Sequence, residues 1–302
     1  MKKQTVKKSK IKLSRSDRIL EIFVYTTMTL LLLVVLYPLI FVLSSSFSSG
    51  SAVGSGKVIL WPVDFSLIGY KIVFDYDIVW TGYLNTLIYT VVVTTLNLIM
   101  TIMVAYPLSR KNFQGRNFYM TLYIITMFFG GGIIPSYLLM SSLHLTNTRW
   151  VLMLGGVSAY NMIIMRTFFQ SNIPNELHEA AKIDGITDLG YLLKVVVPLS
   201  KTVFSVITLY YAVGHWNAYF SAMLYLRDRN LYPLQLILRD ILNVSKVDLS
   251  QIDDPELLAQ MQGASDVMKY ALVVIATVPI LILYPFVQKY FEKGVMIGSV
   301  KG

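Results

Sequence analysis

The sequence has no cysteine and is short of charged residues and of histidine. Of its 302 residues, 14% are charged, three are histidine and 55% belong to the apolar set AVILMFWYC. Without cysteine, a disulfide framework, a thiolate metal site and a cysteine nucleophile are excluded. Soluble domains are about 25% charged, so the composition also excludes an ordinary water-soluble enzyme and indicates a membrane protein.

Six stretches of the chain are strongly apolar and almost free of charge. A helix needs about 20 apolar residues to cross the roughly 30 Å hydrocarbon core of a bilayer. The fourth stretch is short and reaches that length only if the Arg166 side chain extends toward the headgroups. The sequence therefore predicts an all-α polytopic membrane protein with its transmembrane domain over residues 19–290. The six spanning helices are expected at 20–46, 81–108, 118–142, 149–170, 198–224 and 269–290.

The basic residues lie mostly on one side of these predicted spans. Of the 26 lysines and arginines, 18 fall on the side of the two termini, where the net charge is +11, and the opposite side has a net charge of −2. Cytoplasmic loops carry the excess of lysine and arginine, so both termini are expected in the cytoplasm. Residues 1–18 form a basic arm, interpreted as an orientation signal and lipid tether rather than a nucleic-acid-binding arm. Residues 291–302 form a cytoplasmic tail.

The chain lacks the usual internal energy sources for transport. No charged residue lies near the middle of a predicted span, whereas proton relays and many ion-coupled carriers need one. The glycine-rich stretch 50–57 fails the spacing of a phosphate-binding loop, because Ser51 stands at its first glycine position and Val58 stands where Ser or Thr must hold Mg²⁺. If the protein moves a solute, the energy is expected to come from another subunit.

Residues 174–194, between the fourth and fifth predicted spans, form the most informative segment. Asn172 or Asn175 is expected to cap a short helix that carries a proline and acidic residues in its first turn. The helix should run to Ile183 and stop at Gly185, because glycine tolerates the left-handed conformation found at helix ends. The segment is expected to lie along the cytoplasmic face of the membrane.

Two adjacent alanines, Ala180 and Ala181, should give this helix a low-profile surface that another protein can approach closely. Glu179 and Asp184 flank that surface. A second amphipathic piece is expected from Asp188 onward. A solvated interfacial loop is the alternative interpretation of the whole segment.

The order of a carboxylate, paired alanines, an aspartate-glycine turn and a later proline resembles the EAA signature of the membrane subunits of bacterial ABC importers. The residues that carry this resemblance are Glu179, Ala180, Ala181, Asp184, Gly185 and Pro198. Runs 65–70, 214–219 and 288–302 are similar to the carbohydrate-uptake branch of that family, and run 130–139 is similar to its polygalacturonan and alginate permeases. Ile186 departs from the pattern, since alanine is usual there.

The resemblance implies an ABC importer type I permease fold in the bacterial cytoplasmic membrane, with a coupling helix that sits in a groove of a cytoplasmic ATPase. It implies four partners: a second homologous permease, an ABC ATPase dimer, an extracytoplasmic solute-binding protein and an oligosaccharide substrate. ATP and Mg²⁺ would be bound by the ATPase, and the chain itself would hold no cofactor, no metal and no catalytic residue. The implied coupling residues are Glu176, Glu179, Ala180, Ala181, Asp184 and Gly185, with Lys301 and Gly302 of the tail.

Two other functions stay open at this point. The first is an ABC permease for another solute class, such as amino acids, peptides or phosphate. The second is a carrier or channel that works without any partner.

Aromatic and amide side chains in or near the spans are candidates for a sugar path, because sugar rings stack on aromatic faces and their hydroxyls bond to amides. Interhelical hydrogen bonds and an interfacial aromatic belt are the alternatives. The candidates are Tyr137, Tyr160, Asn161, Trp216, Asn217 and Tyr219. Outer segments 47–80 and 225–268 are sizeable, and the second is interpreted either as a docking surface for a binding protein or as a solvated cap.

Overall fold

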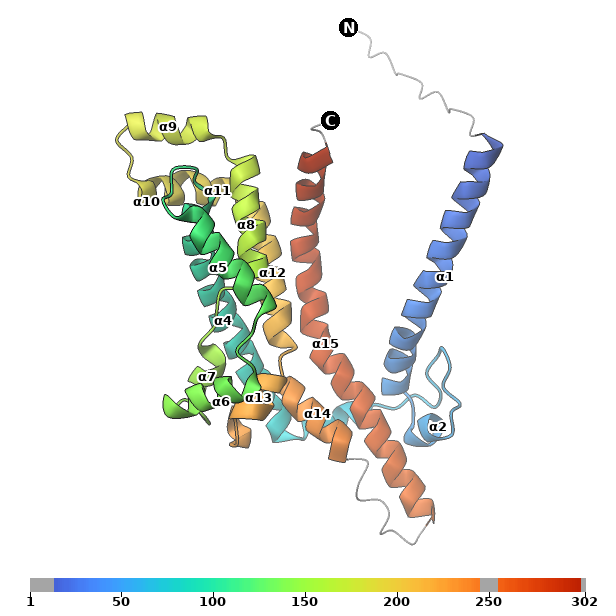
Figure 1. Cartoon of the computed structure of the whole chain (residues 1–302). Coiled ribbons are helices and arrows are strands. Elements are labelled where there is room, and N and C mark those ends of the chain that lie inside the picture. Colours follow the sequence, from blue (N-terminus) through green and yellow to red (C-terminus); the bar gives the residue numbers. More distant parts are fainter. Residues whose placement is uncertain (1–13, 245–254, 300–302) are drawn as a thin grey trace. The chain divides into compact units, whose positions relative to one another are not determined.

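A computed structural model of the chain describes residues 14–244 and 255–299. The regular elements in these residues are all helical, and no β-strand occurs among them (Figure 1). The chain divides into two compact units, Met1–Gly69 with Asp254–Ala271 and Tyr70–Asp253 with Leu272–Gly302. The all-α prediction is confirmed for the described residues.

The first unit contains α1 (Arg15–Ser46), α2 (Gly50–Gly54) and the first part of α15 (Pro255–Ser299). A capping box starts α1: the Ser14 hydroxyl accepts a hydrogen bond from the Asp17 amide, and the Asp17 carboxylate accepts one from the Ser14 amide, each at 3.2 Å. This pair satisfies two donors that a helix start would otherwise leave open.

The second unit is a bundle built around α4 (Asp77–Ser109), which packs against α8 (Ala159–Asn172) and α12 (Lys201–Trp216). Met162 and Met165 of α8 and Ile207 of α12 are fully buried in its core. Figure 1 shows α9, α10 and α11 at one end of this bundle and α6, α7, α13 and α14 at the opposite end. The unit also contains the following elements: α3 (Ile68–Phe74, which starts before the unit boundary), α5 (Arg116–Phe128), α6 (Ile133–Ser142), α13 (Phe220–Tyr225), the 3₁₀ turn η2 (Arg229–Leu231) and α14 (Leu234–Val244).

Three described helices are long and apolar enough to cross a membrane: α1, α4 and the Gly263–Pro285 part of α15. Two bent pairs raise the number of candidate spans to five. One pair is α5 with α6, at 109°, and the other is Asp188–Leu199 with α12, at 82°. The first bend falls at the glycines of residues 130–132, inside the predicted span 118–142.

The fourth predicted span, 149–170, is not a single helix. The chain forms α7 (Trp150–Met153) and then α8, with the non-helical residues 154–158 between them. A Cβ at Gly155 would overlap the side-chain amide of Asn97 on α4, so the backbone comes too close to α4 there for any larger residue. Helix α8 has 14 residues and is about 21 Å long, which is less than the roughly 30 Å hydrocarbon core.

Asn147 fixes the loop between α6 and α7 to the segment that follows α13. Its backbone is left-handed, with φ +56°, and its amide N donates to the Tyr225 carbonyl at 2.8 Å. Its Oδ1 accepts from the backbone amides of Arg227 at 2.9 Å and of Asp228 at 2.8 Å. One side chain thus ties two distant parts of the chain together.

Replacing Asn147 by Ala should lower the stability of the protein, because two hydrogen bonds are lost and the left-handed backbone is kept. At about 0.5–1.5 kcal/mol per bond, the expected loss is about 1–3 kcal/mol. The thermal unfolding midpoint of the protein purified in detergent measures it. Asn147→Asp keeps the acceptor and should unfold near the wild-type temperature. An Asn147→Ala protein as stable as wild type would contradict the assigned role.

Candidate functional site

Helix α9 (Asn175–Ile183) lies across one end of the bundle (Figure 1). Pro174 occupies its N-cap position and no side-chain capping bond is made, so the expected asparagine cap is wrong. Asn172 belongs to α8 and bonds back within that helix, while Asn175 is the first residue of α9. Glu176 in the first turn favours the helix electrostatically, because the N-terminal end of the helix dipole is positive.

The end of α9 agrees with the sequence prediction. The helix stops at Ile183, and Gly185 has φ +72°. The Gly185 amide donates to the Lys182 carbonyl at 3.1 Å, and the Ile186 amide donates to the Ala181 carbonyl at 2.9 Å. These bonds satisfy carbonyls that the helix end would leave open, and they make the turn tight.

The two alanines of α9 face in different directions. Ala181 is 6% exposed and packs into the bundle core, whereas Ala180 is exposed. Successive helix residues point about 100° apart, so the expectation that both alanines share one outward surface is wrong. The outward face carries Glu176, Glu179 and Ile183, all exposed, and the Ile183 side chain is 87% exposed.

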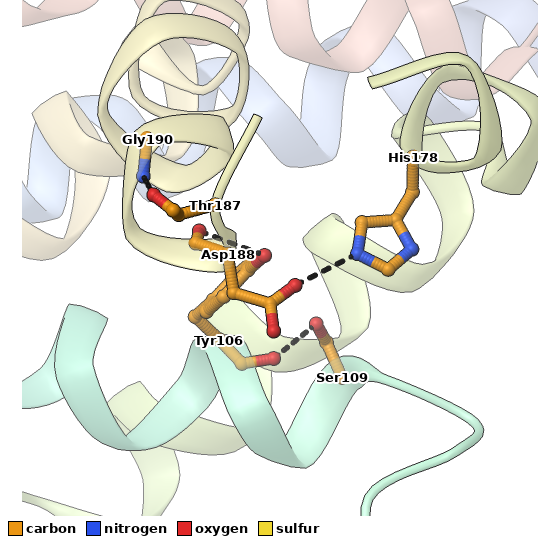
Figure 2. A network of polar contacts seen from close by, with 6 residues as sticks. All are labelled: Tyr106, Ser109, His178, Thr187, Asp188 and Gly190. Carbon is orange, nitrogen blue, oxygen red and sulfur yellow. Dashed lines mark hydrogen bonds and ion pairs between the residues drawn. The ribbon is translucent and has the colours of Figure 1, made fainter. Parts of the chain in front are cut away.

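The second amphipathic piece forms where it was predicted. Helix α10 (Asp188–Tyr191) is capped by the Thr187 hydroxyl, which accepts from the Gly190 amide at 3.2 Å (Figure 2). A π-helical turn, η1 (Leu192–Val196), and α11 (Val197–Leu199) continue it toward α12.

One hydrogen bond joins α9 to α10. The His178 Nε2 donates to the Asp188 Oδ1 at 3.1 Å, and Figure 2 shows the two side chains pointing toward each other. Because a carboxylate only accepts, Nε2 must carry a proton. This hydrogen bond lowers the pKa of the Asp188 carboxyl. The group is therefore an anion at neutral pH and keeps accepting the hydrogen bond from His178. The Tyr106 hydroxyl of α4 donates to the Asp188 carbonyl at 3.4 Å.

Tyr191 ties the same segment to the bundle core. Its side chain is fully buried, and the His178 ring meets it edge-on with the ring centroids 5.0 Å apart. The Arg110 guanidinium lies 4.7 Å from the Tyr106 ring centroid and 5.0 Å from that of Tyr191. Cation–π contacts of this kind stabilise by about 0.5–2 kcal/mol. The buried pair Ala181 and Tyr191 and this guanidinium form what we call the α9 anchor.

A cleft of about 610 Å³ opens beside the α9 anchor. Arg110 and Lys111 line it from the end of α4, and Glu179 and Lys182 line it from α9. Its wall is therefore charged and continuous with the outward face of α9.

The predicted path residues do not form one cluster. Tyr137 stacks on Tyr225 with centroids 6.0 Å apart, and Tyr160 lies 6.5 Å from Tyr210. Asn161 is buried, at 6% exposure, in the first turn of α8. Tyr160 and Asn161 thus lie side by side in sequence at the start of α8, whereas Tyr137 belongs to α6.

The remaining three candidates lie at the end of α12. Trp216 is buried, and its Nε1 donates to the Ala276 carbonyl of α15 at 2.9 Å. Asn217 and Tyr219 are exposed and lie in the break between α12 and α13.

Several polar residues of the site were not found from the sequence. On α4, the Asn97 amide lies 3.1 Å from the His215 Nε2, and the Thr101 hydroxyl lies 2.8 Å from that of Tyr211. A cavity of about 260 Å³, lined in part by His215, lies in the same bundle. The sequence feature that could have indicated them is the recurrence of asparagine and threonine along an apolar helix, because such polar groups need hydrogen-bond partners inside the protein when the helix lies in lipid.

Comparison with known proteins identifies the family. Residues 97–297, more than half of the chain, match the family described as binding-protein-dependent transport system inner membrane component. The chain belongs to this family. It is therefore a multi-pass membrane transport component, a permease, and the permease fold predicted for it is confirmed.

Relatives match the permease over nearly its whole length. The polygalacturonan/rhamnogalacturonan transport system permease protein YtcP of Bacillus subtilis is 40% identical over 95% of this chain and 99% of its own. Protein LplC of the same organism is 39% identical over 89% of this chain and 90% of its own. Among solved structures, a chain of a bacterial ABC transporter involved in the import of the acidic polysaccharide alginate matches with a TM-score of 0.83 and 37% identity, covering 93% of this chain and all of that one.

Two predicted site residues, Lys301 and Gly302, lie outside the described residues.

Replacing Gly185 of the permease by Val should loosen the turn after α9. A residue with a Cβ in the left-handed region costs about 1–2 kcal/mol, which is about five- to thirtyfold in the population of the opened turn. The rate of trypsin cleavage after the exposed Lys182 should rise accordingly. Gly185→Asn, which tolerates this conformation better, should raise the rate less. Equal cleavage of wild type and Gly185→Val would contradict the turn's role.

Proposed function

We propose that the chain is the permease subunit of a binding-protein-dependent ABC importer that moves a carbohydrate, an oligosaccharide or polysaccharide fragment, across the bacterial cytoplasmic membrane. The observation that carries the proposal is the 40% identity to a polygalacturonan/rhamnogalacturonan permease over 95% of the chain. The match to a chain of an alginate importer supports it. Permeases for amino acids, peptides or phosphate are the alternative in the same family.

In this proposal α9 is the coupling helix. Its outward residues Glu176, Glu179 and Ala180 enter a groove of a cytoplasmic ATPase, and the adjoining charged cleft receives side chains of that partner. Two features support the role: α9 presents an exposed face, and the α9 anchor fixes that helix to the spanning bundle. Asp184 and Gly185 shape the turn that ends the helix. The ATPase dimer would bind ATP and Mg²⁺ and hydrolyse the nucleotide, and Lys301 and Gly302 would reach between its subunits.

The transporter would contain a second homologous permease, the ATPase dimer and an extracytoplasmic binding protein that docks on outer segment 225–268. Both termini would lie in the cytoplasm. The positive charge excess on their side supports this orientation, and α9 would then face the ATPase. The bend at 130–132 and the break in the helix at 217–219 would supply points at which the bundle can rearrange as the ATPase opens and closes.

The sugar path would be lined by the exposed aromatic and amide groups of the bundle. Tyr160, Asn217 and Tyr219 are exposed and Tyr137 is half-buried, so these side chains can reach a solute. Asn161 and Trp216 are buried, so they would act by holding the path walls in place.

Replacing Glu179 by Lys should abolish uptake and the stimulation of ATP hydrolysis by loaded binding protein, because the exposed anion would pair with a cation of the ATPase. Breaking a buried ion pair costs about 3–5 kcal/mol. The assay is uptake of labelled oligosaccharide by proteoliposomes that hold the whole transporter. Glu179→Gln should retain more activity than Glu179→Lys, since no like charge is introduced.

Glu21→Lys makes the same charge reversal on α1 and serves as the matched control, which should transport normally. Membrane insertion and subunit assembly of each variant are checked by purification through another subunit. Normal uptake by Glu179→Lys would contradict coupling through α9. Uptake of amino acids, peptides or phosphate in place of oligosaccharides would contradict the carbohydrate substrate and leave the coupling role intact.

A further inference from the structure

The break between α12 and α13 faces two polar residues of α14. The Gln235 Nε2 donates to the Asn217 Oδ1 at 3.4 Å, and the Arg239 guanidinium lies 5.7 Å from the Tyr219 ring centroid. Residues four apart lie on the same helix face, so Gln235 and Arg239 reach the break from one side of α14. We call these four residues the outer subsite.

Helix α14 is held firmly by its other side. Leu234, Leu236 and Ile237 are buried, and α14 packs so closely on α4 that a Cβ at Gly82 would overlap Ile237. The Leu234 amide donates to the Thr86 hydroxyl at 2.7 Å. Gln235 and Arg239 are therefore presented by a fixed helix, so less conformational entropy is lost when a ligand binds to them.

The neighbour that the structure gives the Arg239 guanidinium is the aromatic ring of Tyr219. It is half-buried, and among the described side chains it forms no ion pair. Burying an arginine is costly, and it usually pairs with a carboxylate or a phosphate. The open donors of its guanidinium can form a bidentate pair with such a group.

The other three residues suit a sugar ring. Tyr219 is 40% exposed and offers an aromatic face, and Asn217 and Gln235 offer amides for hydroxyl groups. A neutral sugar would use these three groups and leave the guanidinium unpaired. A sugar acid would use all four.

We propose that the outer subsite binds a uronate unit of an acidic oligosaccharide, with its carboxylate on Arg239 and its ring on Tyr219. This inference rests on the proposed carbohydrate transport and adds the charge of the substrate. It also makes Arg239 a specificity-determining residue of the permease.

The test uses the whole transporter and two sugars, trigalacturonate and the neutral trimer made by reducing its carboxyl groups. Equilibrium binding of each labelled trimer to the purified complex, without the binding protein, gives two dissociation constants. A charge-assisted hydrogen bond lost from Arg239→Gln should weaken trigalacturonate binding about tenfold or more. Binding of the neutral trimer should change less than twofold, and Arg239→Lys should fall between.

Arg227→Gln is the matched control, because it removes a charge from the same segment without touching Tyr219, and it should bind both trimers like wild type. Tyr219→Ala should weaken both trimers, because both have a ring to stack. Complex assembly and basal ATP hydrolysis show that each variant is folded.

Three results would overturn the inference. The first is no saturable binding of trigalacturonate to the wild-type complex, and the second is an equal effect of Arg239→Gln on the binding of both trimers. The third is that Arg239→Gln no longer weakens trigalacturonate binding once the complex is placed in vesicles of phosphatidylcholine alone. The last would assign Arg239 to an anionic lipid headgroup. Uptake by the same complex distinguishes a failure of the outer subsite from a failure of the proposed function. Transport of neutral oligosaccharides alone contradicts the outer subsite and keeps the proposed function, whereas uptake of no oligosaccharide contradicts both.

Discussion

The burial of Ala181 and Tyr191 in the bundle core is the interaction on which the rest of the structure depends. A short helix at a membrane surface has little stability of its own. Here one alanine and one tyrosine of the α9–α10 segment enter the same core as α4, α8 and α12, and Arg110 stacks on the tyrosine. A displacement of α9 must therefore move the bundle, because close-packed cores transmit strain.

Polar groups inside the bundle follow from the same need for packing. In lipid, an amide or hydroxyl must find a partner within the protein, and Asn85 of α4 does so by accepting from Arg149 and donating to two carbonyls beyond α13. The non-helical stretches 154–158 and 217–219 come close to other parts of the bundle. Irregular backbone at membrane depth is tolerated where other protein groups or a water-filled cavity satisfy it.

The sequence predicted the helical class, the end of α9 and the start of α10, because glycine, proline and charge act locally. It did not predict which alanine is buried, since that depends on how α9 lies against α4 and α8. It also missed the division of 149–170, which arises from the close approach of Gly155 to Asn97. Arg239 could not be recognised, because its contact with Tyr219 joins residues that are far apart in the chain.

The central claim is that the outward face of α9 contacts an ATPase. The chain has no cysteine, so a single introduced cysteine is unique in this subunit. A short thiol-to-amine crosslinker at Ile183→Cys, where the native side chain is 87% exposed, should join the permease to the ATPase in membranes, and the same reagent at Ala181→Cys should not. Absence of that crosslink at position 183, or labelling there by an impermeant maleimide from outside intact cells, would contradict the account.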